Sequence, residues 1–341
     1  MNPIDRNYKE ELIQALCIKL NQAIIDASYE TVPLHGGTLG TVMLVSGTAK
    51  TSEGKEIPYS MVHKTQIQWS RHFDVDSWRR EFDLYASGLE ELFTESFRWP
   101  KCYHSKLSDN ELQLWMEYIE GSSASALTPD MFEQIAKELG RFQGQIFAKQ
   151  PVQLKNLSNL SNPEFAKKNY YHYRSWPEVY DYIRDENCSL PKHLCRMLIE
   201  LDENAADIWK QIESLPIVFC HRDFWITNIF YSNGKIRLID WDTTGWGYLG
   251  EDIASLIADE SDITQMMQYY RRCVPAYYEG FSEYADISAI TNPYILEMML
   301  LKFGYRLVEA YKFGDTEEER QLQLDTLQKI YEIQTLLCNR Y

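Results

Sequence analysis

Residues 215–242 read LPIVFCHRDFWITNIFYSNGKIRLIDWD and contain the pattern on which the interpretation of this chain depends. Two apolar runs, LPIVFC and KIRLI, have the β-branched and aromatic content of short buried strands. The loop between them carries His221, Arg222, Asp223 and Asn228, and the second run ends at Asp240. The sequence therefore predicts two buried strands whose ends bring two carboxylates and an amide into one cleft.

These residue types suit the transfer of a phosphoryl group. A carboxylate beside an acceptor hydroxyl orients that hydroxyl and takes its proton, and Mg²⁺ prefers hard oxygen ligands such as Asp and Asn side chains. An HxD triplet is common by chance, but the ordered set in this strand and loop context is not. We expect Asp223, Asn228 and Asp240 to act on one triphosphate.

CHRDFWITN followed by IRLIDWD resembles the catalytic loop and metal-binding strand of the aminoglycoside phosphotransferase and choline kinase superfamily. The resemblance implies that Asp223 is the catalytic base and that His221 braces the catalytic loop. It implies that Asn228 and Asp240 hold Mg²⁺, and that Asp252, in the stretch EDIA, also braces the loop. It covers roughly residues 29–260 and implies ATP or GTP as the phosphate donor.

The stretch before the catalytic loop resembles the smaller lobe of the same superfamily. Strand-like runs ETVPL, GTVMLVSG and IPYSMVHKTQ are followed by an expected helix over residues 75–92. The turn with Gly36, Gly37 and Thr38 would let backbone N–H groups approach phosphates, although an ordinary hairpin turn is the plainer alternative. The resemblance implies that Lys64 neutralises the α- and β-phosphates.

Glu81, on the expected helix, stands where the family places a glutamate that pairs with this lysine, and Glu90 is its nearest competitor. LQLWMEYIEG, at 112–121, resembles the last strand and hinge of the smaller lobe. Met116 would lie behind the adenine, and the backbones of Glu117 and Ile119 would form hydrogen bonds with it. A solvated strand lysine, a surface glutamate and a plain strand are the alternatives for these three segments.

The order of elements predicts an α+β protein with a protein-kinase-like two-lobe fold. A small β-rich lobe with one main helix would span residues 1–117, and a large, mostly helical lobe residues 118–341. Leucines and an isoleucine at i, i+4 spacing predict a helix over residues 5–27. Further strands are expected at 101–107 and 111–118, and helices at 130–148, 193–213 and after 252. Residues 149–191 are expected to be irregular, and DTEE at 315–318 has the pattern of a helix-starting capping box.

Trp246 and Tyr248, which follow the metal strand, are candidates for contact with the acceptor. Asp242 could touch a cationic acceptor or a second metal, and a solvated loop acid is its favoured alternative. The stretch NYYHYRSWPEVYDY, at 169–182, holds six tyrosine and tryptophan rings that suit a quaternary ammonium or a sugar face. Core packing is the alternative for at least half of them. Gln143 occupies a helix position where the resembling family often has a histidine, and we infer nothing from it.

The bulk composition is that of a globular protein, with 45% hydrophobic and 25% charged residues among 341. A formal charge of −16 argues against a nucleic-acid partner and is compatible with a cationic substrate, although solubility alone is the favoured explanation. We expect no membrane span, because no window of about 18 apolar residues occurs. The polar start of the chain and seven scattered cysteines favour a cytoplasmic location.

The expected reaction is transfer of the γ-phosphate of ATP or GTP to a hydroxyl of a small molecule, either aminoglycoside-like or another cationic acceptor. A choline, ethanolamine or sugar kinase is the alternative. A protein kinase is disfavoured because Trp225 replaces the usual lysine, IDWD replaces DFG, and only eleven residues separate Asp240 from Asp252. A nucleotide-binding pseudokinase scaffold is disfavoured because Lys64 and all three loop and strand ligands are present.

Overall fold

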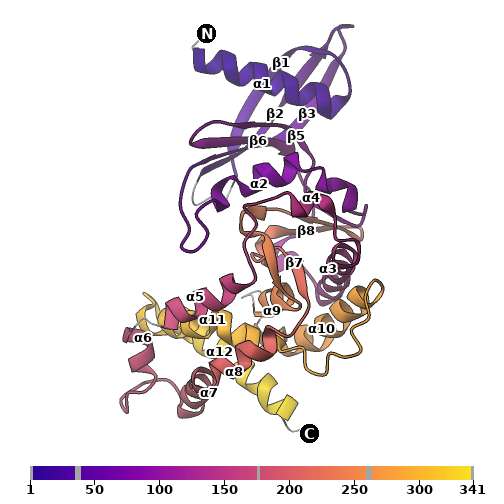
Figure 1. Ribbon diagram of the computed structural model, residues 1–341. Helices are drawn as coiled ribbons and strands as arrows, with labels where there is room; N and C mark the ends of the chain where they lie inside the picture. Colours follow the sequence, from indigo (N-terminus) through magenta and orange to yellow (C-terminus); the bar gives the residue numbers. More distant parts are fainter. Residues whose placement is uncertain (1–2, 35–39, 175–176, 259–262, 339–341) are drawn as a thin grey trace. The chain divides into compact units, whose positions relative to one another are not determined.

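The computed structural model describes residues 3–34, 40–174, 177–258 and 263–338 (Figure 1). The chain forms two compact units. The smaller unit comprises residues 1–121, 153–159 and 237–242, and the larger comprises 122–152, 160–236 and 243–341. A single boundary after Glu117 therefore leaves out two short segments, one of them holding Asp240, that join the smaller unit.

An antiparallel sheet of five strands, in the order β1-β2-β3-β6-β5, forms the centre of the smaller unit. Its strands are β1 (Ile24–Pro33), β2 (Gly40–Thr51), β3 (Glu56–Ile67), β5 (Cys102–Leu107) and β6 (Glu111–Glu117). Helix α1 (Pro3–Leu20) packs against β1 and β5, and α2 (Ser77–Ala86) packs against β5 and β6. Two short elements follow α2, the 3₁₀ helix η1 (Leu89–Leu92) and strand β4 (Phe97–Arg98).

Strand β3 separates two apolar clusters, because successive side chains of a strand point to opposite faces. Tyr59 and Met61 are buried in the cluster that includes α1. Val62 lies on the other face, in the cluster with Trp78 of α2. Lys64 shares the face of Val62, as strand alternation predicts, and so points to the α2 side of the sheet.

The expected helix over residues 5–27 is wrong at its end. Helix α1 stops at Leu20, and the next residue, Asn21, has the left-handed φ of 50° that commonly ends helices. Ile24, which continues the i, i+4 pattern, starts β1 instead and is buried in the same cluster as Leu12 and Leu16. A helix and a strand that contribute to the same core thus produce the i, i+4 pattern of apolar residues expected of one helix.

The larger unit is mostly helical. Its helices are α3 (Pro129–Lys149), α5 (Glu164–Arg174), α6 (Pro177–Tyr182), α7 (Lys192–Glu203), α8 (Ala205–Ile212), α9 (Glu251–Ala258), α10 (Met266–Ser282), α11 (Ile295–Phe313) and α12 (Glu317–Cys338). Its short strands are β7 (Ile217–Cys220), β8 (Ile229–Ser232) and β10 (Gly245–Tyr248), of which β10 pairs antiparallel with β7. Helix α4 (Val152–Lys155) and strand β9 (Lys235–Leu238) each cross a boundary between the units.

Two expectations for this region are corrected. Residues 149–191 are not irregular throughout, because α5 and α6 lie within them. The expected helix over 193–213 is divided at Asn204 into α7 and α8. The capping box before the last helix is confirmed: Thr316 Oγ1 accepts from the N–H of Glu319 at 3.1 Å, and Glu319 Oε2 accepts from the N–H of Thr316 at 3.3 Å.

Short 3₁₀ helices complete the chain: η2 (Ala124–Ala126), η3 (Ile226–Asn228), η4 (Trp241–Thr243) and η5 (Ile263–Gln265). Within the described ranges, none of the helices combines the length and the apolar character needed to span a bilayer.

Candidate active site

The catalytic loop of the larger unit is anchored by hydrogen bonds to Asp252, the second residue of α9. Its carboxylate accepts from the N–H of His221 at 2.8 Å and from the N–H of Arg222 at 2.7 Å, and the side chain is only 1% exposed. Burial raises the pKa of Asp252 to about 6, while the N–H donors of the loop oppose that rise. Asp252 therefore contacts the backbone of the two loop residues that precede Asp223.

Gln143 of α3 completes this anchor, although the sequence analysis drew nothing from it. Its Nε2 donates to Asp252 Oδ2 at 2.9 Å and to the carbonyl oxygen of Phe219 at 3.1 Å. Tyr277 of α10 donates its hydroxyl to Gln143 Oε1. Its position on the buried face of α3, between Gly140 and Gly144, is a signal that could have identified it.

Asp223 is held by two donors from its own loop. Trp225 donates its indole N–H to Asp223 Oδ1, and Asn228 Nδ2 donates to Asp223 Oδ2 at 3.0 Å. Asn228 Nδ2 also reaches the carbonyl oxygen of Asp223 at 3.0 Å. Because the amide nitrogen of Asn228 is used in this way, its Oδ1 is the atom left to meet a cation.

The two motif segments both contain a non-glycine residue in the left-handed region of the Ramachandran plot. Arg222 has φ of 69° and Asp240 has φ of 63°. Such conformations cost about 1–3 kcal/mol each and gather at functional sites, where the surrounding structure enforces them. Here the hydrogen bond of Asp252 to the Arg222 N–H is one such constraint.

In the smaller unit, Lys64 lies between two carboxylates. Its Nζ is 2.6 Å from Glu81 Oε2 and 2.9 Å from Asp240 Oδ1. Glu81 is 2% exposed, whereas its competitor Glu90 is exposed on η1. Burial lowers the pKa of Lys64, but the carboxylates of Asp240 and Glu81 outweigh burial and raise it, so the ammonium group stays charged.

Asp242 belongs to the same cluster of charged side chains in the smaller unit. It is 7% exposed, and its Oδ1 lies 3.7 Å from Arg71 Nη2. Burial, and then the negative charge of Asp240, raises the pKa of Asp242 to about 7, while Arg71 and Lys64 oppose this rise. Near neutral pH this carboxyl group is therefore poised between its two protonation states.

The smaller-unit cluster fits a divalent cation. Three carboxylates, on Glu81, Asp240 and Asp242, lie within 4 Å of the cationic groups of Lys64 or Arg71. In the described part of the chain no three His, Cys, Asp or Glu side chains converge as a self-sufficient metal site. Mg²⁺ is typically bound by one or two protein oxygens together with waters and substrate phosphates, so this sparse oxygen donor set suits it.

Some of the groups expected to contact the nucleotide at the end of β6 already interact with other parts of the smaller unit. Met116 is buried against α2, and Ile119 follows the strand in irregular backbone. Glu117 forms an ion pair with Arg98 at 2.6 Å, and its N–H donates to the carbonyl oxygen of Lys101 at 2.8 Å. The expected glycine turn, with Gly36, Gly37 and Thr38, lies outside the described residues.

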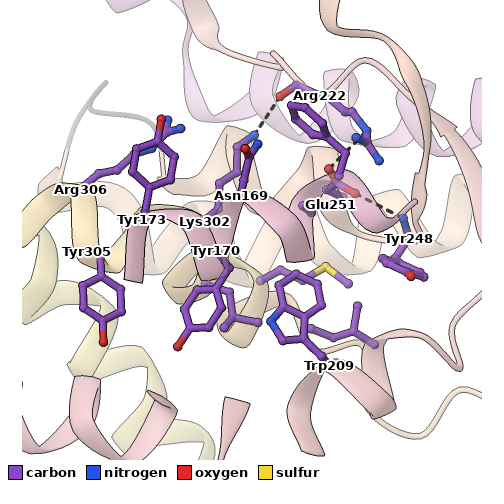
Figure 2. Close-up of a pocket in the computed structure, with 15 residues that line it drawn as sticks. Asn169, Tyr170, Tyr173, Trp209, Arg222, Tyr248, Glu251, Lys302, Tyr305 and Arg306 are labelled. Atoms are coloured by element: carbon purple, nitrogen blue, oxygen red, sulfur yellow. Dashed lines mark hydrogen bonds and ion pairs between the residues drawn. The ribbon is translucent and has the colours of Figure 1, made fainter. Parts of the chain in front are cut away.

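A cavity of about 70 Å³ opens in the larger unit beside the catalytic loop (Figure 2). It is lined by α5, α8 and α11, with Arg222, Tyr248 and Glu251 at one end. Tyr248, one of the candidate acceptor residues, lines this cavity. Trp246 is not among the lining residues, and its N–H donates to the carbonyl oxygen of Ser161 at 2.8 Å.

The tyrosine-rich stretch divides between this cavity and the surface of the unit. Tyr170 and Tyr173 of α5 line the cavity. Tyr180 instead lies under the guanidinium of Arg184, and Tyr182 hydrogen-bonds Ser189 at 2.6 Å. The tryptophan of this stretch, at position 176, lies outside the described residues.

Solved structures with similar folds are small-molecule kinases. A choline kinase from Cryptosporidium parvum Iowa II is 17% identical, with a TM-score of 0.58 over 96% of this chain and 97% of that chain. An amicoumacin kinase in complex with AMP-PNP, Ca²⁺ and Ami is 11% identical, with a TM-score of 0.57 over 97% and 96%. A thermostable mutant of aminoglycoside phosphotransferase APH(4)-Ia, with AMP-PNP and hygromycin B, is 13% identical, with a TM-score of 0.53 over 90% and 95%.

These likenesses confirm the expected α+β, protein-kinase-like fold. The family model APH, described as the phosphotransferase enzyme family, matches residues 81–286, which is more than half of the chain. The protein therefore belongs to the phosphotransferase enzyme family, within the superfamily that its catalytic-loop motif indicated. A search of curated protein sequences gives no match.

Proposed function

We propose that the protein is a Mg²⁺-dependent kinase that transfers the γ-phosphate of ATP, or of GTP, to a hydroxyl group of a small molecule. The observation that carries this proposal is the catalytic loop. Trp225 and Asn228 orient the Asp223 carboxylate, and Asp252 holds the backbone of the two preceding residues. Membership of the phosphotransferase family supports the reaction class.

In this proposal Asp223 accepts a hydrogen bond from the acceptor hydroxyl and takes its proton as the phosphoryl group is transferred. Its two loop donors restrict the carboxylate to one orientation, so it meets the hydroxyl without first reorganising. His221 keeps its proposed role as a loop brace, since its carbonyl oxygen accepts from Thr243 Oγ1 at 2.7 Å.

Lys64 is proposed to bind the α- and β-phosphates, and Glu81 to keep it charged and directed. The Lys64 contact to Asp240 would give way when phosphate oxygens compete for the ammonium group. Asn228 Oδ1 and the Asp240 carboxylate are proposed to hold Mg²⁺, which when bound neutralises charge on the phosphates. For the adenine, the carbonyl of Glu117 and the backbone of Ile119 remain proposed, since the Glu117 N–H is engaged.

The chemical class of the acceptor is proposed from the substrates of similar kinases. The chain resembles kinases of choline and of aminoglycosides, which are cationic, and its formal charge of −16 is compatible with such an acceptor. A sugar kinase is the alternative. In each case the reaction at Asp223 is the same.

A pair of substitutions tests the proposal. Asp223→Asn should lower kcat by roughly 10²–10⁴-fold in ATP turnover against a panel of amino alcohols, aminoglycosides, sugars and hydroxy acids, with nucleotide affinity nearly unchanged. Asp240→Asn should instead weaken Mg²⁺-nucleotide binding, measured by calorimetry. Asp207→Asn, on the exposed surface of α8, is the matched control and should leave both quantities unchanged.

Full turnover by Asp223→Asn would show that another group is the base. Tight Mg²⁺-nucleotide binding by the natural chain with no transfer to any member of the panel would favour a scaffold. Transfer to a peptide library but to no small molecule would favour a protein kinase.

A further inference from the structure

The cavity beside the catalytic loop is basic, although the chain as a whole is strongly acidic. Three cationic side chains line it, from Arg222, Lys302 and Arg306, against the single carboxylate of Glu251. Figure 2 shows these cations along one side and the rings of Tyr305, Tyr170 and Trp209 along the other. A cavity built to hold an ammonium group would carry the opposite charge.

Its buried polar atoms that lack partners are hydrogen-bond donors. Arg222 is 5% exposed, yet its Nε and Nη1 have no hydrogen-bond partner among the described residues. Arg222 Nη2 donates to the carbonyl oxygens of Asn162 and Trp246, and Nε forms an ion pair with Glu251 Oε1 at 3.6 Å, which is longer than a hydrogen bond. Trp209 Nε1 is likewise buried and unsatisfied within the described chain. Unsatisfied buried donors are costly, so they point to an acceptor group that the cavity takes up.

The other two cations have no carboxylate partner in the described part of the chain. Lys302 Nζ donates to the carbonyl oxygen of Arg222 at 2.8 Å and to Ser255 Oγ at 2.6 Å, which leaves one of its three protons. Arg306 is exposed, and its guanidinium lies 4.5 Å from the centre of the Tyr173 ring. Burial lowers the pKa of Lys302, whereas the negative charges of Glu251, Asp252 and Asp223 favour its ammonium form through space, without an ion pair.

The cavity adjoins the proposed base. Arg222 is the residue before Asp223, and Lys302 holds the Arg222 carbonyl oxygen. Lys302 Nζ also lies 5.5 Å from the ring centre of Trp225, the residue that donates to Asp223. A molecule anchored on Lys302 would therefore lie beside the catalytic loop at Arg222, whose neighbour in the sequence is the proposed base, Asp223.

We propose that this cavity binds the acceptor, and that the acceptor is a hydroxy acid with an apolar or aromatic body whose carboxylate is recognised by Lys302, Arg306 and Arg222. The inference rests on the proposed function and replaces the cationic acceptor class with an anionic one. Tyr170, Tyr173 and Trp209 supply ring faces for the apolar body, and the basic side chains supply charge-assisted hydrogen bonds.

A matched pair of probes tests the charge preference without nucleotide. 4-(Hydroxymethyl)benzoate and 4-(hydroxymethyl)benzylamine share ring and hydroxyl and differ in charge. Calorimetry on the full chain should show the benzoate binding at least about tenfold more tightly than the amine. Lys302→Gln and Arg306→Gln should each reduce that preference severalfold. Lys312→Gln, on the same helix but outside the cavity lining, is the control and should keep it.

Because Lys302 is tied to the catalytic loop, Arg306→Gln, at an exposed position, keeps the test valid if Lys302→Gln does not fold. Equal binding of the two probes, tighter binding of the amine, binding of neither at millimolar concentration, or a preference unchanged in Arg306→Gln would overturn the inference. None of these results touches the phosphotransferase proposal, which fails only if no acceptor in the panel is phosphorylated.

Discussion

Individual residues around the catalytic loop divide into those that would meet substrate and those that hold the loop. Asp252 belongs to the second group, since its carboxylate is buried and accepts two N–H groups of the loop and the amide of Gln143. It contributes through the shape of the backbone that precedes Asp223. Its replacement should therefore affect the chemical step more than nucleotide binding.

Asp252→Asn tests this positioning role. In the variant, an NH₂ group replaces one of the two carboxylate oxygens of Asp252, and both of these oxygens accept from N–H donors in the natural chain. One hydrogen bond to a charged acceptor is therefore lost, which should cost about 2–3 kcal/mol of stability. We expect kcat to fall at least about tenfold while KM for the nucleotide changes little. Steady-state kinetics and denaturant unfolding measure both effects. A rise in nucleotide KM with unchanged kcat would contradict the assignment.

At the scale of elements, α3 and α10 pack with their backbones in contact. A Cβ on Gly140 of α3 would meet the carbonyl oxygen of Tyr277 at 2.0 Å, and one on Gly280 of α10 would meet that of Lys137 at 2.1 Å. This close approach brings Tyr277 within reach of Gln143, and through it supports Asp252. The glycines of one helix pair thereby influence the catalytic loop.

Gly140→Ala should destabilise the protein by at least about 2 kcal/mol, because two backbones must separate to admit one methyl group. Gly304→Ala on α11 is the matched control, since its Cβ would meet terminal methyl groups of Leu198, at 3.0 Å, and of Leu300, at 4.0 Å. These side chains can move, so the control should change stability by about 1 kcal/mol or less. Denaturant unfolding of the two variants side by side gives the comparison, and equal losses would contradict it.

The elements also show which features a sequence can predict. Asp223 and Asn228 are five residues apart on a loop between two apolar runs, so local pattern was enough to place them together. Lys64 and Glu81 were paired correctly by strand alternation and family resemblance. Gln143 and Lys302 reach the same loop from distant helices, and only tertiary packing decides which polar residue on a helix faces it. For the same reason, the pattern at the end of α1 was misread: Ile24 shares a core with α1 without belonging to it.

Across the whole molecule, charge is unevenly distributed. The formal charge of −16 is a property of the surface as a whole, whereas the cavity lining is basic. Net charge governs solubility and long-range attraction, while the groups in a binding site decide which ligand is held. If the cavity binds the proposed hydroxy acid, the acidic composition is a poor guide to the acceptor.

Stability of the whole chain against acid should depend measurably on His63. This side chain is 6% exposed and stacks on Trp115 with ring centres 4.1 Å apart. Burial lowers its pKa to about 4 from 6.5, although Glu11 of α1 and then Gln113 and Glu111 of β6 favour the charged form. Between these two pH values the unfolded chain binds a proton that the folded chain does not, so stability falls as pH decreases.

His63→Phe keeps a ring against Trp115 and removes the titration. Raised pKa values of Asp242 and Asp252, to about 7 and about 6, act in the opposite direction and operate in both proteins, so the difference between the two isolates His63. Relative to the variant, the natural chain should lose about 2–3 kcal/mol of unfolding free energy between about pH 7 and about pH 4.5. Denaturant unfolding at the two pH values measures this difference. The prediction is contradicted if the difference in unfolding free energy between the two proteins stays constant with pH. His63 would then be accessible to protons in the folded chain, which requires the α1 face of the sheet to open before the rest of the molecule unfolds.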